Sequence, residues 1–142
     1  MKAKSVSFKV VIVGLAAILS ILFTPGPASA SGTSCSYGNP LYGPSYYCET
    51  VSGSGTYVSS VSGSFRGSAV ICNYSITAEF FSYGWSWYQT LYSGTRWGCA
   101  NGDNLYIPVY NYKWPGYVCS TLSYYDGLGR YRTMSACNEI HS

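Results

Sequence analysis

Polar and apolar residues alternate along much of the chain after residue 30, and apolar runs with helical spacing are absent. Leu105, Ile107 and Val109, for example, are each separated by a single residue. A period of two places every second side chain on the same face of a strand. The residue types agree, because Tyr, Val, Thr, Ser and Gly dominate this part of the chain. The pattern therefore predicts strands and turns.

The stretch between Cys72 and Cys99 predicts a hairpin whose turn falls within Tyr83–Trp87. Pairing the two cysteines also sorts apolar from polar side chains, and a slip of one residue would reverse that sorting. The more apolar face is expected to carry Cys72, Tyr74, Ile76, Ala78 and Phe80 opposite Leu91, Ser93, Thr95, Trp97 and Cys99. Two independent constraints thus favour a Cys72–Cys99 disulfide, with Tyr74, Phe80 and Trp97 in the core.

The stretch from Cys119 to Cys137 predicts a second hairpin around the turn signal Asp126–Gly129. Pairing the cysteines places Leu128 at the apex and leaves the sulfurs on the more polar face. The opposite face is expected to carry Val118, Leu122, Met134 and Ala136. This arrangement suits a disulfide at the surface.

Cys35 and Cys48 then pair by elimination, in one of the fifteen connectivities that six cysteines allow. The residues between them predict a compact loop or an irregular hairpin. The Ser- and Gly-rich segment 49–70 is interpreted as one or two weak strands, with a flexible linker as the alternative.

The segment 101–117 predicts a strand between two turns. Asn101–Asn104 is interpreted as a turn, as is the sequence KWPG at 113–116. Pro108 predicts an edge position or a bulge, since proline lacks the amide donor that a ladder needs.

These segments together predict an all-β fold, a small disulfide-stabilised antiparallel β-sandwich or barrel built from six to eight strands in hairpins. Residues 31–142 are expected to form this single domain. The six cysteines are expected to form three disulfides. No CxxC or CxxH spacing occurs and the chain has one histidine, so no metal site and no cofactor is predicted.

Residues 1–30 predict a secretory signal peptide. Three lysines precede an apolar run from Val10 to Phe23, and Ala28-Ser29-Ala30 offers a cleavage site after Ala30. The apolar run is short for a membrane span, so no span is expected after cleavage. We therefore expect a secreted, extracellular protein, and the signal is typical of bacteria.

Charge narrows the classes of partner. The formal net charge is +3, but removal of the three signal lysines leaves five basic and five acidic residues. A neutral protein has little long-range attraction for phosphates or anionic lipids. Nucleic-acid binding and cationic membrane lysis are therefore disfavoured.

Catalytic chemistry has weak support in the sequence, and no catalytic residue is predicted. The one histidine, His141, is next to the last residue, where chains usually fray. A hydrolase with paired carboxylates would need Glu79 to face Asp103 or Glu49 across a cleft. The simpler interpretation of Glu79 is a surface residue paired across strands with Arg96 or Thr90.

Aromatic residues at the predicted turns are the main candidates for function. Turn residues have little core to enter, and exposed Tyr and Trp provide large contact area at low entropy cost. The predicted binding residues are Tyr83, Trp85, Trp87, Tyr88 and Trp114. The leading hypothesis is a non-enzymatic binding protein whose partner is an extracellular protein, such as a hydrolase, or a carbohydrate.

Two other classes of function remain open at the level of sequence. A secreted antibacterial toxin resembling a bacteriocin is the first alternative, and a small secreted hydrolase is the second. Self-association in the cell envelope through exposed strand edges is a further option.

Overall fold

The computed structural model describes residues 30–142, which form seven β-strands and no helix within that range. All of the strand pairs are antiparallel. The strands are β1 (Gly32–Tyr37), β2 (Tyr46–Ser54), β3 (Tyr57–Ser82), β4 (Ser86–Tyr92), β5 (Arg96–Tyr112), β6 (Gly116–Tyr125) and β7 (Tyr131–Ile140). The all-β prediction is confirmed. The predicted signal peptide lies outside the described residues except for Ala30.

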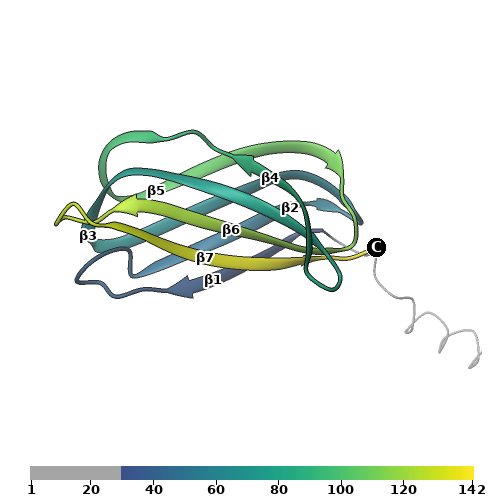
Figure 1. Cartoon of the computed structure of the whole chain (residues 1–142), viewed down its shortest axis with the longest axis horizontal. Coiled ribbons are helices and arrows are strands. Elements are labelled where there is room, and N and C mark those ends of the chain that lie inside the picture. The colour runs from purple at the N-terminus through teal and green to yellow at the C-terminus, as the bar shows by residue number, and fades with distance from the viewer. Residues whose placement is uncertain (1–29) are drawn as a thin grey trace, which may run out of the picture.

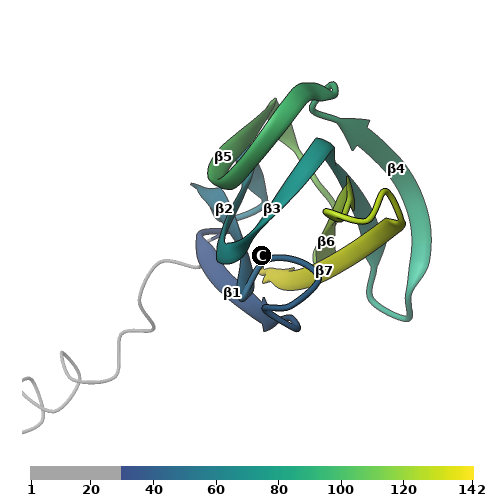
Figure 2. The ribbon, with the colours of Figure 1, turned by 90° about the vertical axis from the view of Figure 1, so that its left-hand side faces the viewer.

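Strand β3, with 26 residues, is the longest of the seven strands and pairs with β2, β4, β5 and β6 (Figure 1). Its first part pairs with β2 as far as Arg66 and with β5 as far as Tyr74, and its later part pairs with β6 from Cys72 and with β4 from Thr77. The sheet path β1-β2-β3-β6-β7 then curls round until β1 and β7 lie side by side, as the end view in Figure 2 shows. The result is a nearly closed antiparallel barrel.

The core lies inside this barrel and follows the alternation of the strands. In β6, Val118, Ser120, Leu122 and Tyr124 are buried, whereas the residues between them are half-buried on the outer face. Each fully buried large apolar side chain stabilises the fold by about 1.5–3 kcal/mol. Further buried apolar residues are Val51, Val58, Val61, Phe65, Ile71, Ile76, Phe80, Leu105, Ile107 and Ile140.

All three predicted disulfides are present: Cys35–Cys48, Cys72–Cys99 and Cys119–Cys137. Each joins residues that lie directly opposite each other on paired strands, with Cα atoms 4.0 Å apart. All six cysteines are exposed or half-buried. The disulfides therefore fasten the barrel from outside and do not fill its core.

The local predictions for three further segments are confirmed. Segment 49–70 is strand rather than linker, and its only break is the turn between β2 and β3. The β6–β7 hairpin keeps the register predicted by its cysteines over its whole length, with Leu128 in the turn. Pro108 pairs with Ser60 beside a register shift, on a strand whose described ladder is with β3 alone.

The predicted position of Trp97 is wrong, because Trp97 is 82% exposed. Asn73 has a φ of +50° and lies where the β3 register shifts. This bulge leaves Tyr74 buried while Cys72 stays on the outer side with Cys99 and Trp97. The Cys72–Cys99 disulfide was therefore assigned correctly but to the wrong face of the sheet.

The predicted turn at Asn101–Asn104 is also wrong, since these residues lie within β5. They pair with the segment of β3 that ends at Arg66. Pairing with a long neighbouring strand overrides the local preference of Asn, Gly and Asp for turns.

Candidate functional site

The turn between β3 and β4 presents the first of the predicted binding residues. Trp85 N donates a hydrogen bond to Ser82 O at 3.0 Å and closes the turn around Tyr83 and Gly84. Gly84 has a φ of +91° and Trp85 a φ of +65°, which is an uncommon conformation for a bulky residue. The turn therefore fixes the backbone from which the indole projects.

The Trp85 indole stacks on the ring of Tyr117, with centroids 4.5 Å apart and an interplanar angle of 5°. Phe81 lies 5.7 Å from Trp85, and the ring of Tyr83 meets Tyr117 edge-on at 5.8 Å. Tyr83 also donates a hydrogen bond through its hydroxyl to Glu139 Oε1 at 2.8 Å. We call Phe81, Tyr83, Trp85, Trp87 and Tyr117 the turn cluster.

Three residues of the turn cluster belong to one row of cross-strand neighbours that runs from β4 to β7. Phe81 of β3 pairs with Trp87 of β4 on one side and with Tyr117 of β6 on the other. Tyr117 in turn pairs with Glu139 of β7. Trp85 and Trp87 nevertheless remain 57% and 58% exposed. Four rings of the cluster thus contact one another, Trp87 lies across the ladder from Phe81, and the cluster still faces solvent.

Tyr88 and Trp114, the other two predicted residues, form a separate pair. Their rings lie 4.9 Å apart, and Tyr88 also packs against the core residue Phe80. Trp114 is exposed in the turn between β5 and β6. Since Gly116 pairs with Ser82, this turn lies beside the β3–β4 turn. The five residues therefore share one end of the barrel in two groups.

A groove that the sequence pattern does not predict lies at the other end of the same outer face. Its aromatic walls include Trp97, which had been assigned to the core, and Tyr131 of β7. The complete lining is Asn73, Ser75, Thr77, Tyr92, Thr95, Trp97, Ser123, Tyr125 and Tyr131. We call it the outer groove. The alternation pattern does not predict this groove, because a strand without the bulge at Asn73 would direct Trp97 into the core.

A polar cluster lies inside the barrel. The carboxyl of Glu49 is fully buried, and its Oε1 accepts a hydrogen bond from Asn138 Nδ2 at 2.9 Å. Its Oε2 has no hydrogen-bond partner among residues 30–142. The hydroxyls of Tyr47 and Ser120 lie 2.5 Å apart nearby in the interior. Burial raises the pKa of Glu49 to about 7, against the opposing effect of its hydrogen bonds.

The acids named for a hydrolase do not meet across a cleft. Glu79 pairs with Thr90 and Cys119 on the outer side of the sheet, whereas Glu49 is enclosed by the barrel. Asp103 pairs with Phe65 and accepts a hydrogen bond from Tyr74 Oη at 2.7 Å. The expected cross-strand pairing of Glu79 with Thr90 is confirmed.

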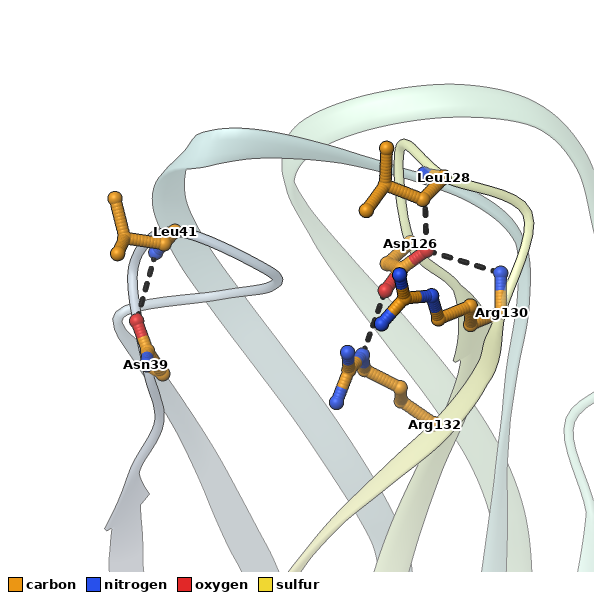
Figure 3. Close-up of polar contacts among 6 residues, drawn as sticks. All are labelled: Asn39, Leu41, Asp126, Leu128, Arg130 and Arg132. Atoms are coloured by element: carbon orange, nitrogen blue, oxygen red, sulfur yellow. Dashed lines mark hydrogen bonds and ion pairs between the residues drawn. The ribbon is translucent and has the colours of Figure 1, made fainter.

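The far end of the barrel is built by two polar turns (Figure 3). Asp126 is almost fully buried and accepts hydrogen bonds from the backbone amides of Leu128 and Arg130, both at 2.9 Å. It also accepts one from Arg132 Nε at 2.7 Å. Asn39 Oδ1 accepts a hydrogen bond from Leu41 N at 3.0 Å in the β1–β2 loop. The Asp126 carboxylate is therefore used to hold its own turn.

Within residues 30–142, no group of three or more His, Cys, Asp or Glu residues is placed to hold a metal ion. No helix in that range is long and apolar enough to span a membrane.

The comparisons with known proteins identify no relative. No family model matches the sequence, and neither a curated protein nor a solved structure matches it.

Proposed function

We propose that this protein is an exported, non-enzymatic binding protein that uses the turn cluster to hold an extracellular polysaccharide. The observation that carries this proposal is the stacking of Trp85 on Tyr117 while Trp85 remains 57% exposed. Tyr117 stacks on one face of the indole and Phe81 lies tilted beside it, so the exposed part of the indole is available to a ligand. Sugar rings have apolar C–H faces that stack on such a surface.

Rigidity supports the proposal. The Cys119–Cys137 disulfide lies two residues along from the Tyr117–Glu139 pair and fastens the two strands together. The hydrogen bond from Tyr83 to Glu139 adds a second link between the turn and β7. A surface that is already ordered loses little conformational entropy when it binds, which favours affinity.

The neighbouring outer face favours a polysaccharide over a protein partner. Between the turn cluster and the outer groove, this face carries the hydroxyl side chains of Thr90, Thr121, Thr133 and Ser135, together with Glu79 and the Cys119–Cys137 disulfide. Among them, Thr121 and Ser135 form a hydrogen bond at 2.8 Å. Hydroxyl groups match the hydroxyls of sugars, whereas the centre of a protein interface is typically apolar.

A pull-down on insoluble glycans tests the proposal. We expect the protein to be retained on at least one of cellulose, chitin or peptidoglycan, and the double variant Trp85→Ala/Trp87→Ala to lose that retention. Tyr112→Ala is the matched control, because Tyr112 is exposed on β5 outside both aromatic surfaces. Retention that survives the double variant would exclude the turn cluster. Capture of a stoichiometric protein partner with no glycan binding would replace the polysaccharide with a protein ligand.

A further inference from the structure

The outer groove is a second aromatic surface that the turn cluster does not include. It has a volume of about 520 Å³, within the usual range of roughly 300–1,000 Å³ for small-ligand sites. Its floor comes from β3 and β6, and its walls come from β7, the end of β4, the start of β5 and the connection between β4 and β5.

Aromatic rings line the groove on more than one side. Trp97 is the most exposed of them, and Tyr92 and Tyr131 are also exposed. Tyr125 and Tyr131 are cross-strand neighbours whose rings meet edge-on at 5.7 Å. Rings on several sides of a groove allow a ligand to be contacted on both of its faces.

Hydrogen bonds and a disulfide fix these walls. The hydroxyl groups of Tyr92 and Thr95 lie 2.5 Å apart. Asn73 Oδ1 accepts a hydrogen bond from Gly98 N at 3.1 Å, next to Trp97. The Cys72–Cys99 disulfide joins the same two segments. The groove is therefore held open without a ligand.

The lining chemistry indicates what the groove can bind. None of its nine residues carries a charge, and the floor consists of hydroxyl and amide side chains such as Thr77 and Ser123. An anionic or cationic ligand would find no opposite charge among these nine residues, and a lipid chain would strip water from their polar groups without compensation. A neutral polyol with apolar ring faces matches both the rings and the floor.

We propose that the outer groove binds a segment of a neutral oligosaccharide. The inference takes its ligand class from the proposed function and rests on it, although different residues carry it. Tyr117 of the turn cluster and Tyr125 of the groove both lie on β6, and both side chains are on the outer face of the sheet. Eight residues of strand span about 26 Å, so one long glycan can contact both surfaces.

Isothermal titration with soluble neutral probes tests the groove. We expect at least one of cellohexaose, chitohexaose and mannohexaose to bind, and Trp97→Ala or Tyr125→Ala to weaken binding by on the order of tenfold. Trp97→Phe should retain most of the affinity, because it keeps a ring in the groove. Trp97 is too exposed for its removal to unfold the barrel, and an unchanged melting temperature verifies this.

Three results would overturn the inference: no binding of any neutral probe, full affinity in Trp97→Ala, or stronger binding of anionic oligogalacturonate than of the neutral probes. The insoluble-glycan assay distinguishes failure of the groove proposal from failure of the proposed function of the turn cluster. If Trp97→Ala changes neither probe affinity nor glycan retention while the Trp85→Ala/Trp87→Ala variant loses retention, the turn cluster binds glycan and the groove does not.

Discussion

Asn138 on β7 donates a hydrogen bond from Nδ2 to the carboxyl of Glu49 on β2, 2.9 Å away inside the barrel. The two residues are far apart in the sequence and lie on strands that pair with different neighbours. The contact exists only because the barrel curls until β1 and β7 meet. The carboxyl group of Glu49 is therefore enclosed among core side chains.

The stability of the barrel should fall as the pH rises from about 4.5 to about 7. Burial raises the pKa of Glu49 from 4.5 to about 7, so the native state binds more protons than the unfolded state in this interval. The stabilisation is fully present below pH 4.5 and is lost as the pH rises through about 7. The expected loss is on the order of 3 kcal/mol, measured by urea unfolding at a series of pH values.

Glu49→Gln should flatten this pH dependence, because glutamine stays neutral at every pH. A slope that persists in Glu49→Gln would contradict the assignment.

Removal of the Cys72–Cys99 disulfide should be the most destabilising of the three disulfide losses. It closes a sequence separation of 27 residues, against 13 and 18 for the other two. Chain entropy predicts a loss of about 3.5 kcal/mol for the Cys72→Ser/Cys99→Ser variant, and about 3 kcal/mol for the others. Guanidinium unfolding measures each value. Because the sulfurs lie outside the core, the folded barrel should persist, and a variant that fails to fold would show that the disulfide supports packing as well.

Gly84→Ala should destabilise the protein by about 1–2 kcal/mol and weaken retention on glycans. Gly84 has a φ of +91°, and no atom lies within 4 Å of an added Cβ, so the cost is conformational rather than steric. The altered turn should also displace Trp85. Gly127→Ala is the control, since Gly127 has no positive φ and its nearest contact is at 4.0 Å. Equal thermal stabilities of the two variants would refute this account of the turn.

Tyrosine ionisation should be incomplete well above pH 10. Burial, followed by the hydrogen bond to Asp103, raises the pKa of Tyr74 to about 12, and burial raises the pKa of Tyr47 still further. Ultraviolet titration of the folded protein should therefore show a late fraction that Tyr74→Phe reduces.

The sequence by itself determined the strands, the three disulfides and the β6–β7 hairpin. The β6–β7 register depends on local alternation and short-range pairing, because two cysteines and one turn leave a single consistent register there. The exposure of Trp85 follows from its position in a turn, whereas Trp87 lies in β4 and is exposed on that strand.

Only the tertiary structure decided which face carries Trp97, where Glu49 lies and which residues form the outer groove. A period-two pattern loses its phase at a bulge, and Asn73 is such a point, so Trp97 could not be assigned from its neighbours. Asn101–Asn104 became strand because β3 is long enough to pair with it. The groove and the interior carboxyl depend on closure of the barrel, which brings together residues that no local pattern relates.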